Sequence, residues 1–233
     1  VASNAQPYLI ECHRGPIAIG HNGNLVNATI LRHELEAAGS IFQSTSDTEV
    51  ILHLYARSHR ERLEDAIAAS LYKVMGAFSL VFLTPDALVA ARDPWGFRPL
   101  VLGRLGAAAV VASETCALDL IDAEYVRDVE PGELVILEPG RPPRSVRFAQ
   151  ATPALCVFEL IYFARPDSYM EGRNLYEARR RMGMQLAAEQ PACVETLLHR
   201  GEQSRVGLGC QRPLLHRRIA VDVGHHGHGQ RRR

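Results

Sequence analysis

The chain of 233 residues carries 26 Lys and Arg side chains against 26 Asp and Glu, so it offers no bulk field for attracting nucleic acid or a membrane surface. Its five cysteines, an odd number at wide and irregular spacing, exclude a disulfide framework and favour a reducing, cytoplasmic compartment. No apolar run approaches the length of about eighteen residues that a membrane span needs, and the first residues lack the plan of a signal peptide. We therefore expect a soluble intracellular protein.

The first third of the sequence predicts three helices. Their expected positions are about 28–38, a second within 44–58, and 63–76. Asn27 is a suitable cap for the first helix, and Gly39 can end it in the left-handed conformation. Ser46 or Asp47 is the expected cap of the second helix.

From residue 77 the period changes to that of strands. Short apolar runs separated by Pro, Gly and Asp predict strands in AFSLVFLT (77–84), ALVAAR (87–92), PLVLG (99–103) and AAVVASE (108–114). Their near-continuous hydrophobicity indicates sheets covered on both faces. CALDLIDA (116–123) predicts a short helix, and YVRDVEPGELVILEPG (125–140) predicts a strand, a Pro-Gly turn and a strand.

The remaining pattern predicts a connection and two more segments. Residues 140–153 are proline-rich and weakly patterned, residues 154–164 are strongly apolar, and residues 174–190 predict a helix that ends before Pro191. Because helices and strands are grouped rather than alternating, the fold class is α+β, a sandwich rather than a regular βαβ arrangement.

The stretch IAIGHNGNL places two amides and a glycine at the end of an apolar run, around Asn22 and Gly23. An asparagine N–H and the following glycine N–H, presented together on a strand end, suit the developing oxyanion of acyl transfer. The alternative is a plain turn, since Asn-Gly is a strong hairpin dipeptide. The two interpretations are separated only by the neighbouring motifs.

Several motifs occur in a fixed order and carry a family resemblance. They are NAQPY (4–8), GPIAIGHNGNLVNA (15–28), FQSTSDTEV (42–50), RDPWGFRPL (92–100), ASETCALD (112–119) and CVFELIYFARPDS (156–168). Together they resemble the glutaminase domain of the amidophosphoribosyltransferases, which are class II glutamine amidotransferases. The resemblance extends to about residue 190, and the FELIYFARPDS stretch favours this branch over other class II amidotransferases.

The resemblance implies an N-terminal-nucleophile hydrolase fold, an αββα sandwich, of which this chain would hold an incomplete copy. In the family an N-terminal cysteine attacks the glutamine amide. Asn22 and Gly23 are then similar to the oxyanion hole, and Asp47, beside Ser46, is similar to the carboxylate that receives the α-ammonium of glutamine. The alternative for Asp47 is a simple helix cap.

Residue 1 is Val rather than Cys, so we expect this chain to be a fragment that is inactive by itself. Cys12 beside His13 is a poor substitute, because neighbouring residues of an extended segment point to opposite faces. Cys156 matches a position that supplies one ligand to a 4Fe-4S cluster in part of the family, but one thiolate does not hold a cluster. Mg²⁺ and such a cluster belong to the full-length family, and we expect neither on this chain. Packing in the core is the alternative for Cys156 and the expectation for Cys116.

The last segment differs in composition. Residues 192–233 hold eight arginines and five of the ten histidines but no Lys, Phe, Tyr or Trp, which suggests an out-of-frame translation and predicts disorder. A zinc site there would use Cys193, His199, Cys210 and His216, whose spacing is unusual for zinc. The expected domains are 1–152, a partial glutaminase domain; 153–191, the entrance to a phosphoribosyltransferase domain; and 192–233, a basic tail.

The resemblance implies that the full enzyme converts glutamine and phosphoribosyl pyrophosphate to phosphoribosylamine, glutamate and pyrophosphate, the first step of purine synthesis. It also implies glutamine as a ligand and a homo-oligomer in the full-length family, with no nucleic acid or membrane partner. Two alternatives stay open: a noncatalytic glutamine-binding or scaffold protein, and another class II amidotransferase.

Overall fold

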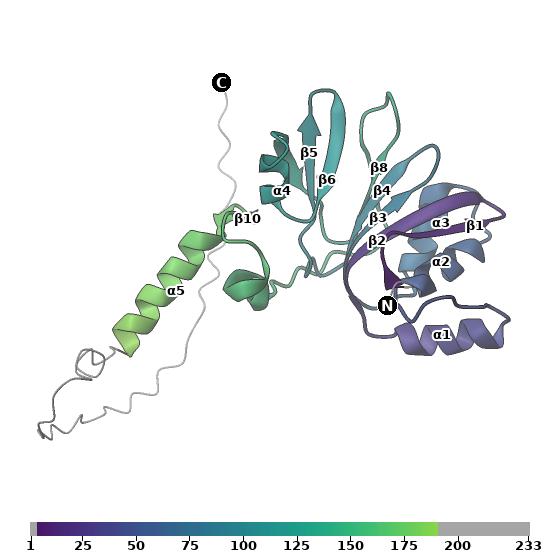
Figure 1. Ribbon diagram of the computed structural model, residues 1–233, viewed down its shortest axis with the longest axis horizontal. Helices are drawn as coiled ribbons and strands as arrows, with labels where there is room; N and C mark the ends of the chain where they lie inside the picture. Colours follow the sequence, from purple (N-terminus) through teal and green to yellow (C-terminus); the bar gives the residue numbers. More distant parts are fainter. Residues whose placement is uncertain (1–3, 191–233) are drawn as a thin grey trace, which may run out of the picture. The chain divides into compact units, whose positions relative to one another are not determined.

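A computed structural model describes residues 4–190 of the chain (Figure 1). It contains two larger antiparallel sheets and a separate two-stranded pairing near the end of the described residues. The larger sheet has the order β1-β2-β3-β4-β8-β9, with strands β1 (Tyr8–Cys12), β2 (Gly15–Leu25), β3 (Gly76–Leu83), β4 (Leu88–Arg92), β8 (Glu133–Leu137) and β9 (Arg144–Arg147). The smaller sheet has the order β6-β5-β7, with strands β5 (Val101–Leu105), β6 (Ala108–Ala112) and β7 (Glu124–Asp128).

Helices cover both outer faces of this pair of sheets. The main core packs the larger sheet against α1 (Ala28–Ala37), α2 (Glu49–Ala56) and α3 (Leu63–Leu71). A second core, including Ala90 and Leu102, lies between the sheets, and a third packs Val101 and Leu118 where α4 (Thr115–Asp119) covers the smaller sheet. The order of layers is therefore helix, sheet, sheet, helix (Figure 1), which confirms the expected αββα sandwich.

The first helix lies where it was expected, but its predicted cap is absent. Gly39 has φ +88°, as predicted for its end. Asn27 precedes the helix without capping it, because its side chain accepts from Met75 N at 2.8 Å and donates to Lys73 O at 2.9 Å. The capping prediction for Asn27 is wrong, since this side chain instead ties the helix start to the segment before β3.

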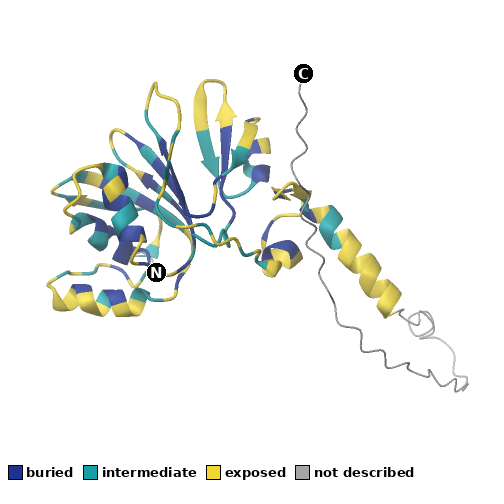
Figure 2. Cartoon of the chain, turned by 180° about the vertical axis from the view of Figure 1, so that it is seen from behind, coloured by how far each residue is buried: buried dark blue, intermediate teal, exposed yellow. Residues whose placement is uncertain are grey.

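The third predicted helix is shorter than expected, ending at Leu71 rather than near Gly76. The four apolar runs after residue 76 are confirmed as β3, β4, β5 and β6. Burial on both faces holds for β4 and β8 but not for β6, where Ala108 and Ala109 are exposed (Figure 2). These residues lie at the tip of the hairpin that β6 forms with β5, where Arg104 and Leu105 are exposed as well.

The strand, Pro-Gly turn, strand prediction for 125–140 is confirmed in its elements, although the two strands do not pair with each other. β7 belongs to the smaller sheet and β8 to the larger one, so the turn carries the chain from one layer to the other. Arg127 and Glu133 fasten this crossing with two hydrogen bonds of 2.7 and 2.9 Å. Because Glu133 is only 3 % exposed, this ion pair holds Arg127 of β7 to a buried carboxylate at the start of β8.

Residues 140–153 are not a plain connection, because they contain β9 at the edge of the larger sheet. After them come a π-helical segment η2 (Glu159–Phe163), a two-residue pairing of β10 (Tyr169–Met170) with β11 (Arg173–Asn174), and helix α5 (Leu175–Glu189). Asn174 caps α5 by accepting from Glu177 N at 3.0 Å, and Figure 2 shows α5 exposed along most of its length. The expectations for residues 192–233, including Cys193, His199, Cys210 and His216, lie outside the described residues.

Within residues 4–190, no helix combines the length and the apolar character that crossing a bilayer requires.

Candidate functional site

Asn22 and Gly23 lie near the end of β2, where they pair with Ser79 and Phe78 of β3. Both are exposed. Gly23 has φ +153°, and a Cβ added there would lie 2.0 Å from the carbonyl oxygen of Ala77. This position requires glycine because β3 approaches the backbone of β2 too closely for any side chain.

Asp47 lies beside the same strand end. Its Oδ2 accepts a hydrogen bond from the backbone N–H of Leu25 at 2.7 Å, and its side chain is 26 % exposed. The cap alternative for Asp47 is therefore wrong, since the carboxylate is bound to β2 and the residue before α2 is Thr48. Ser46 supplies the local bonds instead, accepting from Thr48 N at 3.2 Å and lying 3.4 Å from Asp47 Oδ1.

His21 precedes Asn22 and points to the opposite, buried side of β2, with a side chain that is 2 % exposed. Its Nδ1 lies 2.9 Å from Thr48 Oγ1 and 3.8 Å from Asp47 Oδ1. Burial lowers the pKa of His21 below 6.5, and the nearby Asp47 carboxylate only partly opposes that shift. The imidazole is thus neutral near pH 7 and connects β2 to the start of α2.

The side-chain amide of Asn22 is held at both of its polar atoms. Its Oδ1 accepts from Arg98 Nη2 at 2.8 Å, and its Nδ2 donates to Ser113 Oγ at 3.3 Å. A cavity of about 290 Å³ opens here between the sheets, with Gly20, Ser79, Leu100 and Val111 among the residues that complete its wall. The amide of Asn22 is therefore fixed at the edge of a space large enough for a small polar ligand.

Sequence reasoning missed Arg98 and Ser113 as site residues. Both lie inside motifs that carry the family resemblance, RDPWGFRPL and ASETCALD, but nothing local indicates that they reach Asn22. Arg98 also forms an ion pair with Glu159 of η2, whose side chain is 2 % exposed. Two motifs far from Asn22 in sequence thus contact its amide, and a third reaches it through Arg98.

The rest of the RDPWGFRPL loop is a fixed turn between β4 and β5. Arg92 donates to three backbone carbonyls, among them Val129 O at 2.8 Å, while Asp93 accepts from backbone amides such as Trp95 N at 2.9 Å. Arg92 and Asp93 do not pair with each other in the described structure, because each is fully used in holding the loop.

The described cysteines are Cys12, Cys116 and Cys156, and none of them lines the cavity at Asn22. Cys116 is buried at 6 % exposure, which confirms its packing role. Cys12 Sγ lies 3.6 Å from Gly15 O, and Cys156 is half-buried just before η2. Within residues 4–190 no three Cys, His, Asp or Glu side chains are arranged to hold a metal ion.

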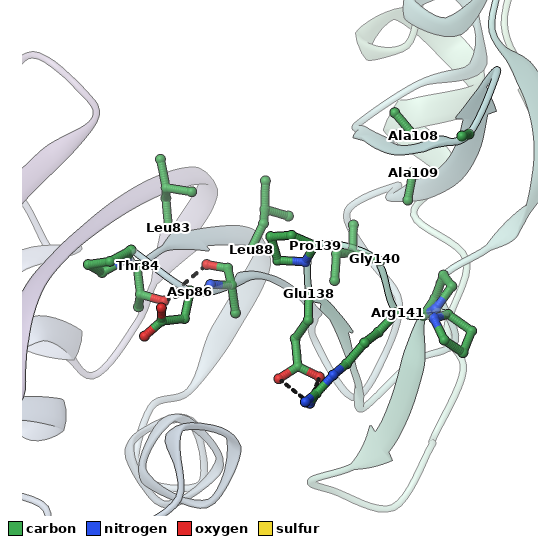
Figure 3. Close-up of a pocket in the computed structure, with 16 residues that line it drawn as sticks. Leu83, Thr84, Asp86, Leu88, Ala108, Ala109, Glu138, Pro139, Gly140 and Arg141 are labelled. Carbon is green, nitrogen blue, oxygen red and sulfur yellow. Dashed lines mark hydrogen bonds and ion pairs between the residues drawn. The ribbon is translucent and has the colours of Figure 1, made fainter.

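A larger cavity of about 810 Å³ lies elsewhere, between the turns that join β3 to β4 and β5 to β6 and the loop after β8 (Figure 3). Its lining is mostly apolar and carries an ion pair of 3.4 Å between Arg141 and Glu138. It shares no lining residue with the smaller cavity. Size alone does not make it the site, since of the predicted residues only Asn22 lines either of these two cavities, and it lines the smaller one.

Comparisons with known proteins show which family this chain is similar to. Residues 1–120 match the family described as "Glutamine amidotransferase domain". Curated amidophosphoribosyltransferases are similar along most of the chain. The one from Rhizobium etli is 46 % identical over 84 % of this chain and 40 % of its own length, and the one from Bacillus subtilis is 47 % identical over 80 % and 39 %.

A solved structure of glutamine phosphoribosylpyrophosphate amidotransferase from B. subtilis, complexed with ADP and GMP, has a TM-score of 0.79 and 46 % identity. It is matched over 82 % of this chain and 42 % of its own. The chain thus spans less than half the length of these relatives. The chain belongs to the glutamine amidotransferase domain family, and the relatives described here are amidophosphoribosyltransferases.

Proposed function

We propose that this chain forms part of the glutaminase domain of an amidophosphoribosyltransferase. The reaction releases ammonia from the side-chain amide of glutamine, leaving glutamate, and the ammonia displaces pyrophosphate from the anomeric carbon of phosphoribosyl pyrophosphate. The observation that carries the proposal is the common position of Asn22, Gly23 and Asp47 at one strand end, with Asp47 bonded to Leu25 N at 2.7 Å.

Each of these groups has a role that its chemistry supports. Asn22 Nδ2 and the backbone N–H of Gly23 are donors for the oxyanion that forms when a thiolate attacks the amide carbon. Asp47 is a carboxylate acceptor for the α-ammonium of glutamine, and the Ser46 hydroxyl lies beside it. The exposure of Asn22 and Gly23 leaves both donors accessible to a substrate.

The nucleophile of this chemistry is a cysteine thiolate, and the described cysteines lie away from the cavity at Asn22. We therefore propose that the 233-residue polypeptide does not turn over glutamine by itself. Cys156 alone does not fit a 4Fe-4S cluster, which needs about four ligands, and no step is assigned to such a group. Mg²⁺ would accompany phosphoribosyl pyrophosphate as part of that substrate.

We place the boundary of the glutaminase domain at residue 152 and assign residues 153–191 to the entrance of a phosphoribosyltransferase domain. The assignment is supported by the position of η2, β10, β11 and α5 after the sandwich is complete. Residues 192–233 are proposed as a separate basic tail on composition alone. The cytoplasmic location and the homo-oligomeric state of the full-length enzyme rest on the sequence and the resemblance.

A glutaminase assay on the purified 233-residue chain tests the proposal. We expect no ammonia release above that of buffer, with or without phosphoribosyl pyrophosphate. Turnover that disappears after alkylation of the thiols would contradict the proposed inactivity. A matched Asn22→Ala variant then shows whether that turnover uses the proposed oxyanion donor.

The second candidate, a noncatalytic glutamine-binding protein, is favoured by the bonded position of Asp47 and by the location of the three described cysteines away from the cavity at Asn22. Calorimetry with L-glutamine separates the two. We expect no saturable heat, because the arginine beside Asn22, Arg98, is already paired with Glu159 and is not free for the α-carboxylate of glutamine. Saturable heat that is lost in Asp47→Asn would support the binding protein.

A further inference from the structure

The orientation of the Asn22 amide is not free, because its two polar atoms have different chemistry. Arginine has only donors, so the atom of Asn22 that faces Arg98 Nη2 at 2.8 Å is the oxygen. Ser113 does not choose between the two orientations, since its hydroxyl both donates and accepts. Arg98 therefore decides that the nitrogen of Asn22, with its two N–H groups, faces the Ser113 side and the cavity.

Arg98 is in turn held in place by its own partners. Glu159 is buried, and Arg98 is the one side-chain partner of its carboxylate within the described residues. The guanidinium also lies over the ring of Phe163, 6.0 Å from its centroid, while the backbone N–H of Arg98 donates to Asp93 Oδ2 at 3.2 Å. If Arg98 turned away, a buried carboxylate would lose its counter-charge.

The other arm of the Asn22 amide reaches the same part of the chain. Ser113 is followed by Glu114, whose Oε2 accepts from Arg165 N and from Ser168 Oγ, both at 2.8 Å. Thr115 Oγ1 accepts from Tyr169 N at 2.8 Å. Arg98 and the two residues that follow Ser113 are thus bonded to residues 159–169, which follow the proposed glutaminase domain.

We propose that Arg98 is a positioning residue for glutamine chemistry, which orients the Asn22 amide with its nitrogen toward the cavity, and that Glu159 holds Arg98 in that position. The role given to Arg98 rests on the proposed function, but the experiment that tests it does not depend on that function. A hydrogen bond from a charged donor to Oδ1 also polarises the amide, which makes the remaining N–H a stronger donor for an oxyanion. The position of η2 thereby affects the Asn22 amide through two side chains, those of Glu159 and Arg98.

The test reads the Asn22 side chain directly, by NMR of the labelled 233-residue chain. We expect a cross-relaxation signal between an Nδ2 proton of Asn22 and the Ser113 β-protons. In Arg98→Met the two orientations of the amide become comparable, so this signal falls about twofold. Arg98→Lys keeps a donor and restores most of it, whereas Glu159→Gln weakens it. Arg104→Met, which removes an exposed arginine paired with Glu124, leaves it unchanged.

An unchanged signal in Arg98→Met, or a fall that Arg98→Lys does not reverse, would overturn the proposal. Loss of folding is recognised from the backbone resonances of Leu25 and Gly76. If Arg98→Met does not fold, the double variant Arg98→Met/Glu159→Gln replaces it, because it leaves no unpaired buried charge at this position. The double variant must show the same twofold fall of the signal, and an unreduced signal counts against the proposal. The measurement uses no substrate, so its outcome is independent of the turnover and calorimetry results that test the proposed function.

Discussion

Replacing Gly23 by alanine is expected to lower the free energy of unfolding by about 4 kcal/mol. About half of this comes from the backbone, because φ at Gly23 is +153°, a conformation that L-residues rarely adopt. The other half comes from packing, because the new Cβ would lie 2.0 Å from Ala77 O and 2.8 Å from Phe78 Cα. The backbones of β2 and β3 must move apart to make room, which costs about 2 kcal/mol.

The structure supplies matched controls for this prediction. Gly20→Ala, in the same strand, has ordinary φ and no neighbour within 4 Å, so it should change stability by less than about 0.5 kcal/mol. Gly106→Ala has φ +60° in open space and isolates the backbone contribution, at about 1 kcal/mol. Gly76→Ala, with φ +150° and a Cβ 2.2 Å from Asn24 O, should be as costly as Gly23→Ala.

Urea unfolding followed by far-UV circular dichroism and by the fluorescence of Trp95 measures all four variants, with a common m-value as the check on two-state behaviour. The expected order of loss is Gly23→Ala and Gly76→Ala, then Gly106→Ala, then Gly20→Ala. If Gly23→Ala loses no more than Gly20→Ala, the close approach of β3 is not what requires glycine at this position, and the reasoning is refuted.

Asn27→Ala and Asn27→Ser should lose the same stability, about 1 to 2 kcal/mol in urea unfolding, because the side chain binds Met75 N and Lys73 O rather than capping α1. Rescue by serine, which is a good cap, would contradict this. The buried His21 has a pKa below 6.5, so the unfolded chain binds the extra proton first and stability falls as the pH drops below about 6.5. His21→Gln should therefore show a flatter dependence of the unfolding free energy between pH 7.5 and 5.5, and equal slopes would count against the assignment.

Local patterns were sufficient where a single element determines its own conformation. The helix after Asn27 and the apolar strands β3 and β4 follow from spacing alone. The strand β9 was missed because only four residues, in a proline-rich stretch, alternate between half-buried and exposed. The apolar segment before Arg165 is helical rather than extended, which hydrophobicity without a clear period does not decide.

The residues of the candidate site also differ in how far the sequence alone predicts them. Asn22 and Gly23 were found because the dipeptide itself carries the chemistry, while the strand contact that requires glycine is visible only in the structure. Asp47 was ambiguous because an acidic residue before a helix suits both a cap and a ligand. Arg98 was missed because its role depends on Asn22 and Glu159, which are 76 and 61 residues away in the chain.

The smaller sheet is an excursion that leaves the larger one after β4 and returns at β8, as the bond of 3.2 Å from Gly132 N to Arg92 O marks. Since Ala91 is already paired with Leu134, a short hairpin turn would satisfy the connectivity of the larger sheet without this excursion. Both side chains that bind the Asn22 amide, those of Arg98 and Ser113, belong to this excursion, residues 93–132. Substitutions or insertions in residues 93–132 can therefore change the environment of the Asn22 amide without changing the core between the larger sheet and helices α1 to α3.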